Sequence, residues 1–470
     1  MKETTKKVIR TAVFIALASA VIAGSYRVLS WKDTMGSYVS SAQQLYATKK
    51  DLIDVLFVGS SHCYAGVNPD MLWRDHGIAA FDMAISGQDR DSAIHYIKEA
   101  LKTQSPSVVV VDLLATLYDE GVESNTWRNV LSMRTSPNQI DLARAEAQDD
   151  DRARKDYVLK WPIVHTRYRE LAAHDFVQNP YSLYGRGYCY RFAAEPYLHD
   201  VQLDEITEAE PVSDANLRWF AELDALAEKE GFSLVYLQIP HEVVPEEKRI
   251  YNGVLAYLTD AGQTLLTADE LIGMAQLNTA TDYMDQGHLN AAGGEKLTGV
   301  LGAWLIEHYA PADHRGDPAY HQWDESLAYA EHLYLEDKLS KIDGPAAWFS
   351  GIAGVDDLVV VLVLSGDYGA SEFDLPKAVS QIGVREAFFE NGGCVVIDDG
   401  ALAGFLTPAK AEDLTLDIDA LHTLHIEPAT DSELSYSVNM DGQEQFNAFD
   451  GLGVVIYDRV LERIIANRAF

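Results

Sequence analysis

Asp54-Val-Leu-Phe-Val-Gly59-Ser60-Ser61-His62 is the stretch that decides the fold. Its apolar run from Val55 to Val58 is bounded by turn residues, which predicts a strand buried on both faces, as in a parallel sheet. The Gly-Ser-Ser turn then places a serine at the end of this strand. Because α/β sheets bind ligands at the carboxyl ends of their strands, Ser61 is a candidate nucleophile.

The residues that would activate this serine occur more than two hundred positions later, in Asp282-Tyr-Met-Asp285-Gln-Gly-His288-Leu-Asn290. A serine nucleophile needs a base to take its proton, and the base needs a carboxylate to orient it. Asp285 and His288 supply both on one short turn. The order Ser61, Asp285, His288 therefore predicts a catalytic triad for acyl chemistry.

Strand-like and helix-like segments alternate between these two motifs. Further strands are expected at 79–85, 107–112, 232–239 and 265–266, and helices at 91–103, 214–230, 248–261 and 291–308. This alternation predicts an α/β fold, with a parallel sheet between two layers of helices. Residues 115–200 exceed an ordinary crossover, so an insertion is expected there. Its tyrosines, between 157 and 190, suit packing or stacking on sugar rings.

Four parts are expected along the chain. Residues 1–32 are a membrane anchor or signal peptide, 33–312 the α/β domain, 313–345 a helical linker, and 346–470 a mainly β accessory domain. The β assignment depends on strand-like runs separated by Gly- and Asp-rich turns, such as Asp398-Asp-Gly400.

The N-terminus has the pattern of a membrane anchor. Four basic residues precede an apolar run from Thr11 to Tyr26. This run would be about 24 Å long as a helix, slightly short for a span unless the helix continues towards Trp31. Ala18-Ser-Ala20 resembles a cleavage site but lies inside the run, so we expect an uncleaved anchor. The basic flank predicts a single-pass protein in the cell membrane, with its globular part extracytoplasmic.

Composition excludes some classes of function. The net charge of −35 argues against nucleic acid as a partner, because phosphate binding needs a basic surface. Cys63, Cys189 and Cys394 are too few for a disulfide framework. No Cys-x-x-Cys or His-rich pair indicates a metal site, and we expect no cofactor.

The two motifs together resemble the SGNH (GDSL-like) hydrolase superfamily over about residues 45–310. The resemblance extends to its membrane-anchored extracytoplasmic branch, which includes the teichoic-acid D-alanine transfer protein and alginate-type O-acetylation proteins. Gly59-Ser60-Ser61 matches the family's Gly-Asp-Ser block, and Asp285 with His288 matches its Asp-x-x-His block. The resemblance implies a flavodoxin-like three-layer fold and Ser61 as nucleophile.

The chain departs from the family pattern at two blocks. Ser60 stands in place of the usual Asp, and no Asn of the third block occurs near Asp112. The resemblance therefore implies an oxyanion hole formed by the N–H groups of Ser61 and Gly87. Supporting roles around the triad are expected for Ser60, His62, Asp112 and Asn290.

Three functions are consistent with this sequence. The first is acyl transfer, of the O-acetylation or D-alanylation type, onto a cell-surface polysaccharide or teichoic-acid-like polymer. A membrane-bound O-acyltransferase is then the partner that the resemblance implies. The second is a carbohydrate esterase with the same triad and water as acceptor. The third is a surface scaffold with weakened catalysis that binds polysaccharide through its β domain.

Overall fold

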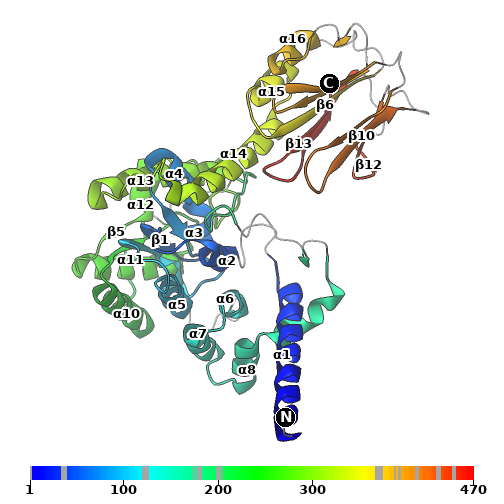
Figure 1. The fold of residues 1–470 in the computed structure, drawn as a ribbon. Coiled ribbons are helices and arrows are strands. Elements are labelled where there is room, and N and C mark those ends of the chain that lie inside the picture. Colours follow the sequence, from blue (N-terminus) through cyan, green and yellow to red (C-terminus); the bar gives the residue numbers. More distant parts are fainter. Residues whose placement is uncertain are drawn as a thin grey trace. The chain divides into compact units, whose positions relative to one another are not determined.

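The computed structural model describes residues 3–32, 40–118, 126–172, 175–176, 183–196, 203, 205–365, 374–385, 388–389, 393–407, 412–429, 436–446 and 451–470. The chain divides into two compact units, Met1–Leu327 and Ala328–Phe470 (Figure 1). Parts of the insertion expected over 115–200, including Tyr181, lie outside the described residues.

The first unit is built on a five-stranded parallel sheet with the order β2-β1-β3-β4-β5. Its strands are β1 (Val55–Val58), β2 (Ala80–Asp82), β3 (Val108–Asp112), β4 (Ser233–Leu237) and β5 (Leu265–Leu266). The expected α/β fold is confirmed. Because β2 and β3 lie on opposite sides of β1, the strand order reverses there. Open parallel sheets bind their ligands at such a reversal point.

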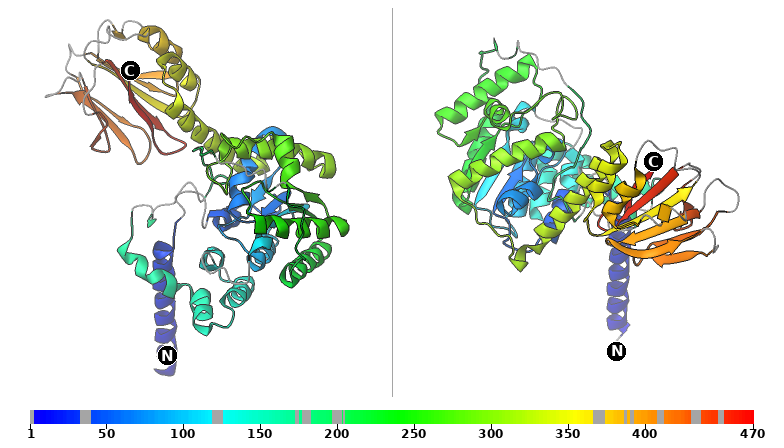
Figure 2. Two further views of the ribbon diagram at one scale, coloured as in Figure 1. Left: turned by 180° about the vertical axis from the view of Figure 1, so that it is seen from behind. Right: turned by 90° about the horizontal axis from the view of Figure 1, so that it is seen from above.

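Helices cover both faces of this sheet (Figures 1 and 2). Leu56 and Val58 belong to one buried core, and Val55 and Phe57 belong to another, as strand alternation requires. The first core includes residues of α5 (Arg90–Ala100), α10 (Asp214–Glu230) and α11 (Pro245–Asp260). The second includes residues of α3 (Ser61–Gly66), α4 (Pro69–His76), α12 (Ala268–Ala275) and α13 (Ala291–Tyr309).

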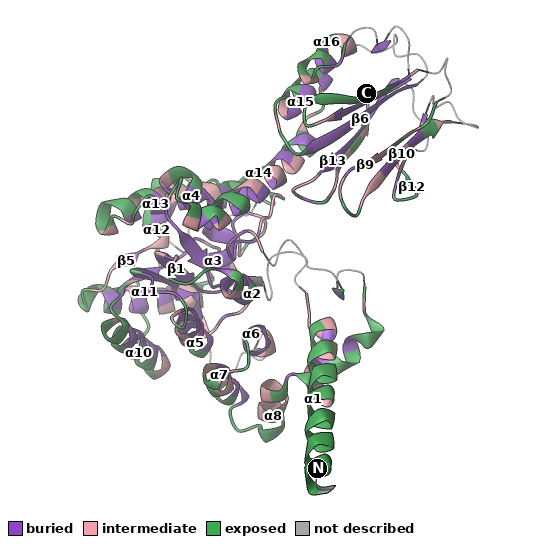
Figure 3. Ribbon diagram, viewed as in Figure 1, coloured by how far each residue is buried: buried purple, intermediate pink, exposed green. Residues whose placement is uncertain are grey.

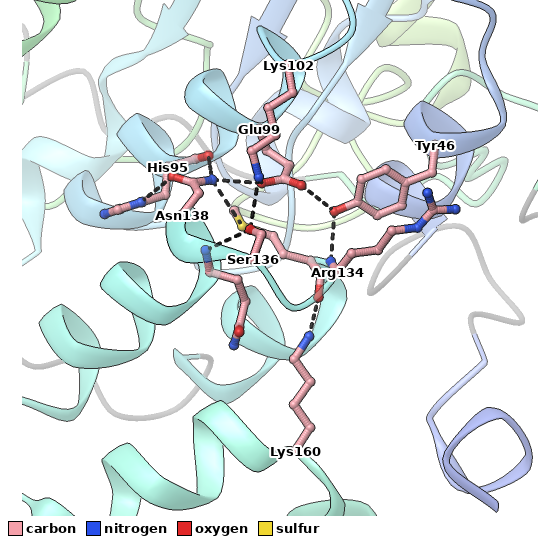
Figure 4. Close-up of polar contacts among 10 residues, drawn as sticks. Tyr46, His95, Glu99, Lys102, Arg134, Ser136, Asn138 and Lys160 are labelled. Carbon is pink, nitrogen blue, oxygen red and sulfur yellow. Dashed lines mark hydrogen bonds and ion pairs between the residues drawn. The ribbon is translucent and has the colours of Figure 1, made fainter. Parts of the chain in front are cut away.

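The expected insertion contains helices, and a buried polar cluster fastens it to the sheet domain. Its helices include α6 (Thr126–Ser132), α7 (Pro137–Ala147), α8 (Asp151–Leu159), α9 (Trp161–Val164) and the 3₁₀ helix η2 (His165–Arg169). Glu99 of α5 accepts hydrogen bonds from Tyr46 of α2 (Ser40–Ala47) at 2.9 Å and from Asn138 of α7 at 2.8 Å (Figure 4). Lys102 pairs with Glu99 and donates to Ser136 at 2.9 Å. The buried carboxylate thus has several partners, as burial of a charge requires.

The part of the insertion around Arg186 and Cys189 bonds to the sheet domain through its backbone. Arg186 accepts a backbone hydrogen bond from Asp82 at 2.8 Å, and the amide of Cys189 donates to Tyr64 at 2.8 Å. Gly187 has φ +92°, and a Cβ there would lie 1.8 Å from the carbonyl oxygen of Asp82. Only glycine allows this approach between the returning segment and β2.

Helix α1 (Glu3–Leu29) is the one helix in the described part of the chain that is long and apolar enough to span a membrane. Its 27 residues correspond to about 40 Å, so the helix does continue beyond the apolar run noted above. Its surface is exposed along most of its length (Figure 3). The C-terminal end of α1, in contrast, packs against residues of the insertion. Leu29 packs with Leu131 and Val164, and Arg167 donates to the Leu29 and Ser30 carbonyls at 3.0 and 2.8 Å.

The second unit contains two antiparallel sheets. One has the order β14-β13-β6-β7-β8, and the other β12-β11-β10-β9. Their strands are β6 (Leu358–Ser365), β7 (Gly393–Asp398), β8 (Ala401–Leu406), β9 (Leu414–Asp417), β10 (Thr423–Pro428), β11 (Tyr436–Met440), β12 (Gln443–Glu444), β13 (Gly451–Asp458) and β14 (Arg463–Ala469). Val361 of β6, Ile426 of β10 and Val438 of β11 share one core, so the sheets pack face to face. Two short helices, α15 (Pro345–Ile352) and α16 (Leu375–Val379), complete a mainly β unit.

The division between the units lies inside α14 (His321–Lys341), whereas the sequence places a separate linker at 313–345. The physical reason is that the start of this segment packs into the first unit. Trp323 is fully buried and donates to the carbonyl of Ala80 at 3.2 Å, and His314 pairs with Asp54 at 2.9 Å.

Candidate active site

Ser61, His288 and Asp285 form one hydrogen-bonded chain. The Nε2 atom of His288 lies 2.8 Å from the Oγ atom of Ser61. Its Nδ1 atom lies 2.8 and 3.0 Å from the two carboxylate oxygens of Asp285. A carboxylate only accepts, so the imidazole proton belongs on Nδ1, and Nε2 is left to accept the serine proton. This is the geometry that a serine nucleophile with its base and orienting acid requires.

A closed loop brings Asp285 and His288 together. The amide of Met284 donates to the His288 carbonyl at 3.0 Å, and the amide of Asn290 donates to the Asp282 carbonyl at 3.0 Å. The Asp285 carboxylate also accepts the Gly287 amide at 2.7 Å. These bonds fix the direction of the carboxylate, which in turn fixes the imidazole ring.

Asn290 anchors this loop to the helix that follows. Its side chain caps α13 by accepting the Gly293 amide at 3.0 Å, and it donates to the Thr281 carbonyl at 2.8 Å. The supporting role expected for Asn290 is therefore consistent with its contacts, which hold the base of the loop.

The turn that carries Ser61 lies at the strand-order reversal. Ser61 is the first residue of α3, directly after β1, and the helix is capped by Ser60. The Ser60 hydroxyl donates to the Asp112 carboxylate at 3.2 Å and accepts the His62 amide. Asp112 ends β3, the neighbour of β1. A Cβ on Gly59 would lie 2.5 Å from the Asp112 Cβ, so glycine is required for this close approach.

Two buried acids lie behind the serine turn. Burial raises the pKa of Asp112 to about 6 and that of Asp82, at the end of β2, to about 8. Burial also raises the pKa of the Cys63 thiol well above its usual value, and Cys63 hydrogen-bonds Asp82. Cys63 is therefore a packing residue, because a reactive cysteine needs a lowered pKa.

Gly87 follows β2 at the same sheet edge. It has φ +62°, a backbone region that favours glycine. The side-chain amide of Asn129 donates to the Gly87 carbonyl at 3.3 Å, so a residue of the insertion holds this peptide. The oxyanion role of Ser61 and Gly87 concerns a reaction intermediate and stays a prediction.

Two further histidines flank the triad. The His62 ring lies 5.3 Å from the His288 ring and 4.3 Å from the ring of His241, which follows β4. Burial lowers the pKa of both flanking imidazoles, well below the usual value for His62. His241 could not be singled out from the sequence, because a lone histidine after Pro240 has no informative spacing. Its position at the carboxyl end of a predicted strand was the available signal.

Comparison with protein-family models finds none that matches this chain, and comparison with curated proteins finds no match either. Within the described residues, no three histidine, cysteine or acidic side chains are arranged to hold a metal ion.

Proposed function

We propose that this protein is a membrane-anchored, extracytoplasmic acyltransferase of the SGNH type, which acts on a cell-surface polymer through an acyl-enzyme on Ser61. The observation that carries the proposal is the hydrogen-bonded chain from Asp285 through His288 to Ser61. Its position at the strand-order reversal of a parallel sheet agrees with where such folds bind ligands.

The chemistry follows from the donors and acceptors. His288 Nε2 takes the Ser61 proton as Oγ attacks the acyl carbonyl, and Asp285 stabilises the imidazolium that forms. The backbone N–H groups of Ser61 and Gly87 would stabilise the oxyanion, and His288 then protonates the leaving oxygen. In the second half-reaction, His288 takes a proton from an acceptor hydroxyl, whose oxygen attacks the acyl-enzyme and releases Ser61.

The identity of the acyl acceptor decides whether the protein is a transferase or an esterase. A polymer hydroxyl as acceptor makes the protein a transferase, and water makes it a carbohydrate esterase. The tight docking of α1 favours an enzyme held at the membrane, where a membrane O-acyltransferase could supply the acyl group.

A fluorophosphonate probe tests the first half-reaction on the full-length protein in detergent. Wild type should be labelled, Ser61→Ala should not be, and His288→Ala should lose nearly all labelling. Ser105→Ala removes an exposed serine bonded to Asp51 and serves as a control that retains labelling. Labelling that persists in Ser61→Ala would reject the assignment of the nucleophile.

An acetyl ester assay with and without added polysaccharide then distinguishes transfer from hydrolysis.

A further inference from the structure

A cavity of about 360 Å³ lies where the end of α1 meets the insertion. None of its described lining residues is acidic, although the chain has 72 acidic and only 37 basic residues. The described stretch 126–172 of the insertion differs from the rest of the chain, since it has nine basic and seven acidic residues. The lining includes aromatic and basic side chains, namely those of Tyr26, Trp31, Tyr46, Trp127, Arg134 and Lys160.

Lys160 places a buried ammonium group in this lining (Figure 4). The Met133 carbonyl accepts one of its three donors, and within the described residues no carboxylate pairs with it. Glu99, the one acid that acts on its charge, is already paired with Lys102. Burial lowers the pKa of Lys160 to about 8, as expected for an ammonium group with too few partners.

The backbone of Lys160 is also strained. This residue joins α8 to α9 with φ +59° and ψ −41°, a conformation that is unfavourable for any residue with a side chain. Glycine would adopt it at lower cost. A lysine at this position therefore indicates that its side chain is needed where it lies.

The cavity lies at the level expected for lipid headgroups. A hydrocarbon core of about 30 Å takes about 20 helical residues, so a span that begins at Thr11 ends near Ser30. Ser30 and its neighbour Trp31 both line the cavity. The rings of Trp31 and Trp127 lie 4.6 Å apart, and tryptophan is typical of the boundary between membrane and water.

The chemistry of the lining favours a lipid phosphate. Two unused donors of Lys160 suit phosphate oxygens, and Arg134, which stacks on Tyr46 at 4.1 Å, adds a second cation. The exposed apolar surface of α1 offers a path for acyl chains away from the cavity. Trp31 and Trp127 also line a neighbouring hollow that contains acidic residues, so an anion is favoured only on the side of Lys160.

We propose that this cavity binds the phosphate headgroup of an anionic phospholipid from the outer leaflet, with Lys160 and Arg134 as its cationic contacts. The inference goes beyond the proposed acyl transfer. It shares only the membrane anchor with that proposal, and no residue of the triad takes part.

The test measures lipid binding to the full-length protein in a non-ionic detergent by native mass spectrometry. The probes are dioleoyl phosphatidylglycerol, dioleoylglycerol, which has the same chains without phosphate, and glycerol 3-phosphate, which has no chains. Wild type should bind phosphatidylglycerol at least about tenfold more tightly than either of the others, because charge-assisted hydrogen bonds and chain contacts both contribute. Equal binding of dioleoylglycerol would overturn phosphate recognition, and equal binding of glycerol 3-phosphate would indicate a site for soluble anions instead.

Two lysine variants locate the site. Lys160→Met keeps most of the side-chain length without the charge and should weaken phosphatidylglycerol binding by about tenfold. Lys155→Met removes an exposed charge from the same insertion, outside the cavity lining, and should leave the affinity unchanged. Equal effects of the two changes would mean that the insertion attracts lipid only through its general charge.

Photocrosslinking of wild type gives a readout that does not depend on a variant. Phosphatidylglycerol with a diazirine near its ester groups should crosslink to residues 26–31 and 127–135. Crosslinks spread evenly along α1, or the same pattern with the matching diacylglycerol, would overturn the inference. Fluorophosphonate labelling of Ser61 in the same samples tests the proposed function separately, since its loss would reject the acyl-enzyme and leave the lipid site standing.

Discussion

Asp82→Asn should make the protein more stable at neutral pH and less sensitive to pH. Asp82 is fully buried, and its carboxyl accepts the Ala84 amide at 2.8 Å. Because burial raises its pKa from 3.8 to about 8, the folded protein keeps this carboxyl neutral at pH 7. The unfolded chain ionises it, which favours unfolding. Asparagine has nearly the same shape as aspartic acid and cannot ionise, so the substitution removes this dependence of stability on pH.

The magnitude follows from proton linkage. Below pH 3.8 the carboxyl is protonated in both states, and its contribution to stability is fully present. As the pH rises, the unfolded chain loses the proton first, so stability falls until both states are ionised above about pH 8. The slope is about 1.4 kcal/mol per pH unit. The free energy of unfolding of Asp82→Asn, relative to wild type, should therefore rise by roughly 3 kcal/mol between pH 5 and pH 7.

Urea unfolding in detergent at pH 4, 5, 6 and 7, followed by tryptophan fluorescence, measures this difference in the free energy of unfolding. Asp112→Asn is the matched comparison. The Asp112 carboxyl of the wild type has a pKa of about 6. The free energy of unfolding of Asp112→Asn, relative to wild type, should therefore rise between pH 4 and pH 6 and then level off. A difference for Asp82→Asn that stays constant from pH 5 to pH 7 would show that Asp82 is ionised in the folded protein and would refute the reasoning.

Three further predictions concern the serine turn, the triad and the anchor. Gly59→Ala should cost about 1–3 kcal/mol in urea unfolding, because its Cβ would overlap β3, whereas Gly299→Ala, with open space around it, should be neutral or better. Equal effects of the two changes would contradict the close approach. Asp285→Asn should slow fluorophosphonate labelling of the serine by roughly 10²–10⁴-fold through loss of the productive imidazole tautomer, and an unchanged rate would remove the carboxylate from the triad. Arg167→Met should increase amide hydrogen exchange of residues 25–31 by about tenfold or more, since it frees the carbonyls at the end of α1, and unchanged exchange would mean that Arg167 does not hold the anchor.

Much of the α/β unit could be predicted, because apolar runs, turn residues and helix caps that lie close together in the sequence mark its elements. The limits of β1, Val55–Val58, agree with the apolar run between turn residues. Helix α10 has the limits expected, with Ser213 as its N-cap and Gly231 in the left-handed conformation at its end. The pairing of Asp285 with His288 is also local, since the two residues are three positions apart in the chain. Their contact with Ser61 is not local, and only the order of the motifs pointed to it.

Other elements have no strong local signal. Strand β8 (Ala401–Leu406) is exposed along most of its length at the edge of a sheet, so its side chains show little of the burial pattern that identifies a strand. Strand β14 (Arg463–Ala469) lies at the opposite edge and is half-buried along most of its length. The location of His241 depends on how β4 is placed beside β3, which the sequence does not specify.

The serine at position 60 can be understood from the charges around it. A carboxylate at this position, as in the resembled family, would lie beside Asp112, whose pKa burial already raises, with Asp82 close behind. Another acid in this buried cluster would raise these pKa values further, because like charges oppose ionisation. The Ser60 hydroxyl instead caps α3 without adding a charge and gives Asp112 a hydrogen-bond donor. Ser60 therefore keeps the turn before Ser61 intact without another charge, and the carboxylate beside it belongs to Asp112 of the neighbouring strand.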